Sequence, residues 1–113
     1  MFIKHFVLDT NIILEDASNI FKLSDAGTNL IVLPETVLDE VDSKKSGFDE
    51  INFQARQFAR ILENAEVVDI VETDSCKIVI LELNEPSKFN IHIISKEISQ
   101  YKKLFFNSNF SKG

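Results

Sequence analysis

One acidic residue, Asp9, directly follows an apolar run, and two small polar residues, Thr10 and Asn11, come next. A second group of acids lies within residues 35–42, just after the apolar run at residues 30–33. Carboxylates that converge repel one another unless a cation lies between them. Their oxygens are hard ligands of the kind that Mg²⁺ and Mn²⁺ take together with water and phosphate-bearing substrates. Such a metal could activate water and clamp a scissile phosphate, so the pattern is compatible with phosphodiester hydrolysis.

The same acids also have a purely structural interpretation. Acids are common turn residues after strands, so Asp9 can cap the turn that follows the apolar run. The acids of residues 35–42 can form a solvated helix face. Residue spacing alone leaves the metal-site and the structural interpretations both open.

Helical phase does not identify the second acid of a metal site. At about 100° per residue, three apolar residues define the buried face of the helix expected over residues 34–45: Val37, Leu38 and Val41. Asp39 is expected to point nearly opposite this face, whereas Glu40 and Asp42 flank it on opposite sides. Either flank could lean toward the sheet, so both Glu40 and Asp42 stay open.

The net charge of −6 is unevenly distributed along the chain. Residues 1–42 hold eight acids and two bases, and the remainder holds ten acids and ten bases, so the whole excess lies in the first part. A negative surface repels a phosphate backbone unless something cationic neutralises it. A divalent metal ion would do so.

The elements that must position these acids follow from the apolar pattern. The expected strands cover about residues 4–8, 30–33, 67–71, 77–83 and 90–94. The expected helices cover about residues 17–24, 34–45, 51–62 and 95–106. Asp16 is expected to be the N-cap of the first helix, and Pro34 to open the second. The order strand, helix, strand, helix, helix predicts an α/β sandwich with a parallel sheet, whose ligands bind beyond the carboxyl ends of the strands.

Length and composition indicate one soluble domain. A chain of 113 residues is long enough for a single core. It contains one cysteine, Cys76, so an internal disulfide cannot form, which fits a cytoplasmic protein. No signal peptide and no membrane-spanning apolar run is visible. His5 and His92 lie in expected strands and are not at a spacing typical of metal ligands, which indicates structural roles.

Three segments resemble the opening of a PIN domain, the nuclease-like fold of many metal-dependent ribonucleases. They are FVLDTNIIL, LIVLPETVLDEVDSKK and INFQARQFARIL, and the resemblance covers about residues 4–63. It is greatest to the PIN domains associated with PhoH-type ATPases. The resemblance implies one PIN-like domain over residues 1–113, a three-layer α/β/α sandwich with a central parallel sheet. That sandwich would be incomplete at its C-terminal end, with residues 107–113 as a frayed tail.

The resemblance also implies roles for residues of the first two motifs. Asp9 and Glu40 correspond to the catalytic acids that bind the metal, which selects Glu40 over Asp42. Thr10 corresponds to the residue that orients this site, and Asn11 supports the turn. The implied activity is an endonuclease that hydrolyses RNA with Mg²⁺ or Mn²⁺.

Two arginines are candidate contacts to RNA. Arg56 and Arg60 lie one turn apart and off the apolar stripe of their expected helix, so they could bind RNA phosphate. Equally, they could belong to a solvated face that pairs with Glu50 or Glu63. The implied partners are single-stranded RNA and either a second copy of the chain or an attached ATPase domain, with no membrane.

The chain departs from the family beyond residue 64. PIN domains supply a third acid, and often a fourth, but Asp69, Asp74 and Glu97 do not have the surroundings that the family pattern requires. The chain is therefore either part of a longer nuclease or a degenerate, non-catalytic PIN-like module that binds RNA or a protein partner.

Overall fold

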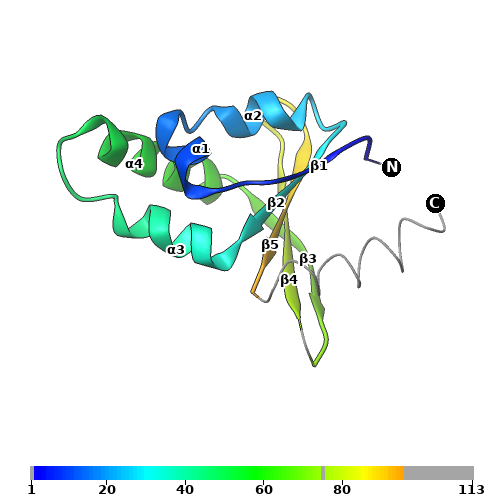
Figure 1. The fold of residues 1–113 in the computed structure, drawn as a ribbon. Coiled ribbons are helices and arrows are strands. Elements are labelled where there is room, and N and C mark those ends of the chain that lie inside the picture. The colour runs from blue at the N-terminus through cyan, green and yellow to red at the C-terminus, as the bar shows by residue number, and fades with distance from the viewer. Residues whose placement is uncertain (1, 75, 96–113) are drawn as a thin grey trace.

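The computed structural model of the protein describes residues 2–74 and 76–95 and shows one sheet with four helices (Figure 1). The elements are β1 (His5–Val7), α1 (Thr10–Glu15), α2 (Asn19–Ser24), β2 (Leu30–Pro34), α3 (Glu35–Ser43), α4 (Glu50–Glu63), β3 (Glu66–Glu72), β4 (Lys77–Leu83) and β5 (Phe89–Ile94). None of the described helices has the length and the apolar character needed to span a bilayer.

The sheet has the strand order β1-β2-β5-β4-β3 and contains both kinds of pairing. β1, β2 and β5 are parallel, which confirms the predicted α/β class, whereas β3 and β4 form an antiparallel pair and β4 is antiparallel to β5. The expectation that segments 67–71 or 77–83 extend the parallel sheet is therefore wrong. Only a short turn separates β3 from β4, and a parallel pair needs a crossover of a dozen residues or more.

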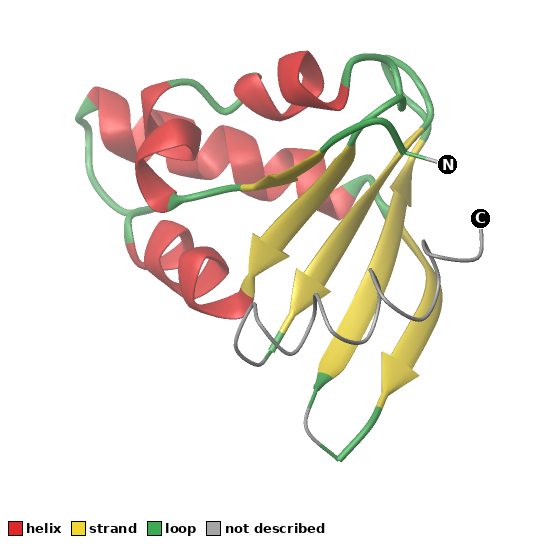
Figure 2. Ribbon diagram, turned by 45° about the vertical axis from the view of Figure 1, so that its right-hand side comes forward, coloured by secondary structure: helices red, strands yellow, loops and turns green. Residues whose placement is uncertain are grey.

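The four described helices pack on one face of the sheet (Figures 1 and 2). The chain moves across the sheet in the same direction when it passes from β1 to β2 and from β2 to β5. Because crossover connections between parallel strands are right-handed, the helices of both connections lie on the same face of the sheet. The core of this face joins helix residues such as Ile13, Ile20 and Phe58 to Ile31 and Leu33 of β2. The predicted helix over residues 95–106, except for Ser95, and the predicted tail at 107–113 lie outside the described residues.

The other face of the sheet holds a second apolar cluster. It contains Leu30 and Val32 of β2, Ile78 of β4 and Ile94 of β5, together with Cys76. Residues 30–33 are all fully buried, so consecutive residues of β2 are covered on both faces, as the continuous apolar run predicts. β2 is thus the central strand of the parallel part.

Helix α1 is an element that sequence periodicity missed. The turn expected at residues 9–11 is the start of a six-residue helix, too short to display a helical period, and Asp9 is its N-cap. The predicted helix at 17–24 begins later, at Asn19, after Ser18. Asp16, predicted as its N-cap, instead accepts hydrogen bonds from the backbone N–H and the hydroxyl of Ser18, which hold the pKa of Asp16 below its ordinary value.

Two histidines share the second face. His92 of β5 is opposite Val32 and Ile80 in the strand register and is 3% exposed. Burial, and secondarily the charge of His5, lower the pKa of His92 to about 4. Burial also lowers the pKa of His5. Because burial disfavours the charged form of His92, protonation of this residue lowers the free energy of unfolding.

We expect the free energy of unfolding to fall as the pH is lowered from about 6.5 to about 4. In this range the unfolded chain binds a proton at residue 92 that the folded chain does not, so acid favours unfolding by about 3 kcal/mol over the whole interval. Urea unfolding of wild type and His92→Gln at several pH values measures this slope. An equal slope in the variant between pH 6.5 and 5, where few carboxylates titrate, would contradict the assignment.

The outer strand β3 exposes apolar side chains at the edge of the sheet. Val67 and Ile70 are 58% and 53% exposed, and Val68 is also exposed. Exposed edge strands tend to pair with other chains unless charges or bulges prevent it. Here the register shifts between Val67 and Asp69, and the Asp69 carboxylate accepts the backbone N–H of Ile70 at 2.8 Å. Asp69 therefore occupies a backbone donor that an added strand would use.

We expect Asp69→Ala to make the chain self-associate. The substitution frees the Ile70 N–H and removes a negative charge from an apolar edge. Sedimentation velocity over a concentration series measures the effect, and Asp74→Ala, which removes an equally exposed acid just beyond β3, is the matched control. Self-association of both variants to the same degree would show that net charge, rather than protection of the edge, is responsible.

Candidate functional site

Asp9 lies at the carboxyl end of β1, where the sequence predicts the chemistry. The N–H of Leu8 donates to the carbonyl of Val32 at 2.9 Å, so the parallel pairing continues almost to Asp9. One carboxylate oxygen of Asp9 accepts the N–H of Ile12 at 3.0 Å, and the side chain is exposed. The capping interpretation of Asp9 is therefore correct. The capping hydrogen bond uses one of the two carboxylate oxygens and leaves the side chain exposed. Capping is therefore compatible with a role of Asp9 as a metal ligand.

Thr10 and Asn11 form the first turn of α1. Thr10 is half-buried and Asn11 is exposed. Both follow Asp9 directly in the chain, and their supporting roles stay predictions.

Glu40 lies on the exposed surface of α3. The hydroxyl of Ser43 donates to the backbone carbonyl of Glu40 at 2.6 Å, so the bond fixes the backbone and leaves the Glu40 carboxylate unengaged by it. Asp42, the competing acid, pairs with Lys45 at 2.6 Å. Glu40 is five residues from the start of α3, or about 7–8 Å along the helix axis, whereas Asp9 lies at the sheet edge where that helix begins.

Asp39 is exposed, which agrees with its expected position away from the apolar face of α3. It lines a pocket of about 280 Å³ together with Glu35 one turn before it, Lys77 and Val79 of β4, and Ser95 after β5. Pro34 both ends β2 and is the N-cap of α3, so the helix starts directly from the strand.

The carboxylates of this edge do not form a complete metal cage. Within residues 2–74 and 76–95, no group of three or more His, Cys, Asp or Glu side chains could hold a metal ion. Asp9 and Glu40 offer hard oxygen donors of the type that Mg²⁺ and Mn²⁺ use, and Mg²⁺ commonly keeps several waters beside one or two protein carboxylates. The donor chemistry fits a divalent ion that is held largely through water and substrate. Glu97, three residues beyond the end of β5, lies outside the described residues.

Arg56 holds the loop between α3 and α4. Its guanidinium donates to the carbonyls of Lys45 and Gly47 at 2.8 and 2.9 Å. Asn52 assists by donating to the carbonyl of Lys44 at 2.7 Å. Gly47 has φ of +124°, a backbone conformation that favours glycine, and a Cβ there would lie 2.4 Å from the Asn52 amide oxygen.

These contacts separate the two arginines proposed as RNA ligands. One guanidinium nitrogen of Arg56 donates both hydrogen bonds to the backbone of the loop, so the main role of Arg56 in the fold is structural. The ion pairs found among the described residues do not join Arg56 to Glu50, and a Glu50 carboxylate oxygen accepts from Gln54 at 2.7 Å. Arg60 is exposed near the end of α4 and keeps the predicted role in RNA binding as a hypothesis.

Two amide side chains that the sequence analysis did not single out position α1. The Gln54 amide oxygen accepts the N–H of Ala17 at 2.8 Å, which ties α4 to the segment after α1. Asn19 donates to the carbonyl of Ile12 at 2.9 Å, which ties α2 to α1. Both support the helix whose N-cap is Asp9. The sequence shows these two residues only as polar positions beside an apolar helical stripe. Such positions are too common to predict the hydrogen bonds that the two side chains make.

Comparison with known proteins gives a family for this arrangement. A family model described as PIN domain matches residues 6–103. The match extends well past residue 63, where the resemblance seen in the sequence ended. Protein PhoH2 of Bacillus subtilis (strain 168) is 42% identical over 60 residues, which are 53% of this chain and 13% of that protein. The chain therefore matches only a small part of the length of that relative. No solved structure matches the chain significantly.

We expect Arg56→Gln to lower the free energy of unfolding by about 1–2 kcal/mol, because two charge-assisted hydrogen bonds to backbone carbonyls are lost. Arg60→Gln removes the same charge from an exposed position and should change stability by less than about 0.5 kcal/mol. Urea unfolding of the two variants measures the difference. Equal destabilisation would show that the hydrogen bonds to the loop do not carry the effect.

Proposed function

This chain belongs to the PIN domain family, and we propose on that premise that it hydrolyses RNA phosphodiesters with a divalent metal ion, Mg²⁺ or Mn²⁺. PIN domains are generally nuclease folds and typically use divalent metals. The observation that carries the proposal is the Asp9 carboxylate, exposed directly beyond the parallel strand β1 and oriented by its hydrogen bond to Ile12. The carboxyl ends of such strands are where open α/β sheets bind ligands.

The proposed roles follow from what each side chain can do. Asp9 and Glu40 would hold the metal ion through carboxylate oxygens, and the ion, when bound, supplies Lewis acidity toward the phosphate and water. Thr10 would orient the Asp9 carboxylate from the first turn of α1, and Asn11 would support the same turn. Arg60 would contact a phosphate away from the cleaved bond, as an exposed guanidinium at a polyanion does.

A bound cation would also reduce the repulsion between the acidic first part of the chain and the phosphates of RNA. The first part of the chain carries the whole excess of negative charge, so an RNA backbone that approaches Asp9 is repelled. A divalent ion between the carboxylates and the phosphate reverses the local sign of the charge. RNA binding at this edge is therefore expected to depend on the metal, and single-stranded RNA is the proposed substrate.

The alternative is a non-catalytic PIN module that binds RNA or a partner protein. It is favoured by one observation, that no group of three potential ligands is assembled within residues 2–74 and 76–95. The similarity to PhoH2 covers 13% of that protein, so we also propose that a PIN domain of this kind works beside an ATPase domain in the cytoplasm.

We expect cleavage of labelled single-stranded RNA in Mn²⁺ that EDTA abolishes. Asp9→Asn and Glu40→Gln should each lower the rate at least about a hundredfold, since even an outer-shell partner of a metal ligand can be worth that much. Asp42→Asn is the matched control on α3, because Asp42 pairs with Lys45 and has no role in the proposed site.

Two results would decide against catalysis by this chain. One is absence of metal-dependent cleavage by wild type. The other is an unchanged rate in Asp9→Asn. RNA binding without cleavage, measured by fluorescence anisotropy on the same samples, would instead establish the non-catalytic module.

A further inference from the structure

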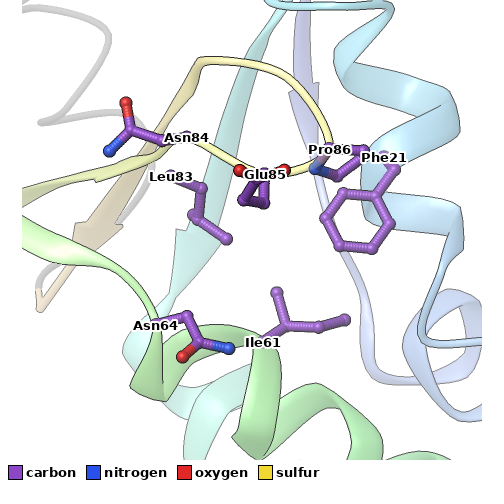
Figure 3. Close-up of a pocket in the computed structure, with 7 residues that line it drawn as sticks. All are labelled: Phe21, Ile61, Asn64, Leu83, Asn84, Glu85 and Pro86. Carbon is purple, nitrogen blue, oxygen red and sulfur yellow. The ribbon is translucent and has the colours of Figure 1, made fainter.

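One hollow among the described residues lies at the opposite end of the sheet from Asp9. It has a volume of about 630 Å³ and is lined by Phe21, Ile61, Asn64, Leu83, Asn84, Glu85 and Pro86 (Figure 3). Asp9 follows the carboxyl end of a parallel strand, whereas this hollow lies where β4 ends and the parallel strand β5 begins. The proposed nuclease chemistry does not use it.

The floor of this pocket is apolar and held in place by the core. Phe21 of α2, Ile61 of α4 and Leu83 of β4 face the hollow from three elements (Figure 3). Leu83 is 2% exposed, and the Phe21 ring stands edge-on to the buried Phe89 ring with centroids 5.8 Å apart. The surface for an apolar ligand body is therefore largely formed before a ligand arrives, and its size is within the range of small-molecule sites.

The rim of the pocket is negative. The Asn64 amide is engaged with its own helix, because its nitrogen donates to the carbonyl of Arg60 at 3.2 Å. Of the described residues that line the hollow, Glu85 alone is charged. The nearby Lys88 pairs with Glu82 at 3.7 Å, so it does not neutralise Glu85 through that contact.

We propose that this pocket binds a small organic cation with an aromatic or other apolar body, such as an amine or amidine. An apolar floor with a phenyl ring suits the body of such a ligand and allows cation–π contact. The carboxylate of Glu85 suits an N–H-bearing cation. Phosphate-bearing ligands are disfavoured, because the charge at the rim has their own sign.

Benzamidine is a probe that carries both features, and benzamide is its neutral counterpart of nearly the same shape. In an NMR titration of the full 113-residue chain, we expect benzamidine to shift the amides of residues 61, 64 and 83–85, with a dissociation constant of order 1 mM. Benzamide should bind several-fold more weakly, and benzoate more weakly still.

The variant Glu85→Gln keeps the shape of an exposed loop residue and removes its charge. It should weaken benzamidine about threefold to fivefold, as expected for an exposed ion pair, and leave benzamide unchanged. Glu72→Gln, which removes an exposed acid from β3, is the matched control and should not change benzamidine binding. RNA cleavage or RNA binding should be the same in both variants as in wild type, so failure of the nuclease proposal does not affect this test.

Three outcomes would overturn the proposal. The first is equal affinity for benzamidine and benzamide, or tighter binding of a neutral nucleoside such as adenosine. The second is equal weakening by Glu85→Gln and Glu72→Gln. The third is the lack of a saturable shift at these residues up to about ten times the expected dissociation constant.

Discussion

The burial of β2 on both faces is the constraint on which the rest of the structure depends. Leu30, Ile31, Val32 and Leu33 are each 0% exposed, and alternate residues belong to the two separate apolar clusters. β1 and β5 pair with the two edges of this strand in parallel. Because the three strands run the same way, their carboxyl ends meet at one edge. Asp9 follows β1 and α3 follows β2, so both begin at this end of the sheet. The position of the candidate site therefore depends on the pairing of β2.

The elements near this strand were predictable because their signals are strong and local. A run of four apolar residues before a proline is typical of a strand covered on both faces. A regular stripe over residues 51–62 predicted α4 within two residues at either end. The pairing of β3 and β4 was not predictable in the same way. Residues 67–71 are apolar enough for a buried strand, yet Val67 and Ile70 are largely exposed, because β3 is the outer strand. Apolar content does not state which strand lies at an edge.

The sequence names candidate residues for the site but does not predict how the fold places all of them. Asp9 was identified from its position after an apolar run, and its capping bond to Ile12 shows why an acid suits that junction. Helical phase correctly leaves Asp39 exposed. It does not include the way in which α3 starts directly from β2, so it could not predict which strands the helix lies near. Arg56 was a candidate RNA contact and equally a candidate for a solvated face. The loop carbonyls that it binds could not be predicted, because backbone carbonyls leave no pattern in the sequence.

The two roles of Asp9 depend on different properties of one side chain. Capping of α1 requires only an acceptor oxygen near the Ile12 N–H, and asparagine supplies one about as well as aspartate. A divalent cation requires the negative charge, which asparagine lacks. The cap therefore orients the Asp9 carboxylate while the side chain keeps its negative charge. The substitution Asp9→Asn keeps the capping oxygen and removes the charge, so it separates the two functions. If a metal were unimportant here, any residue that caps α1 would serve equally well. The same logic holds at Glu40, whose backbone bond to Ser43 is independent of its side chain.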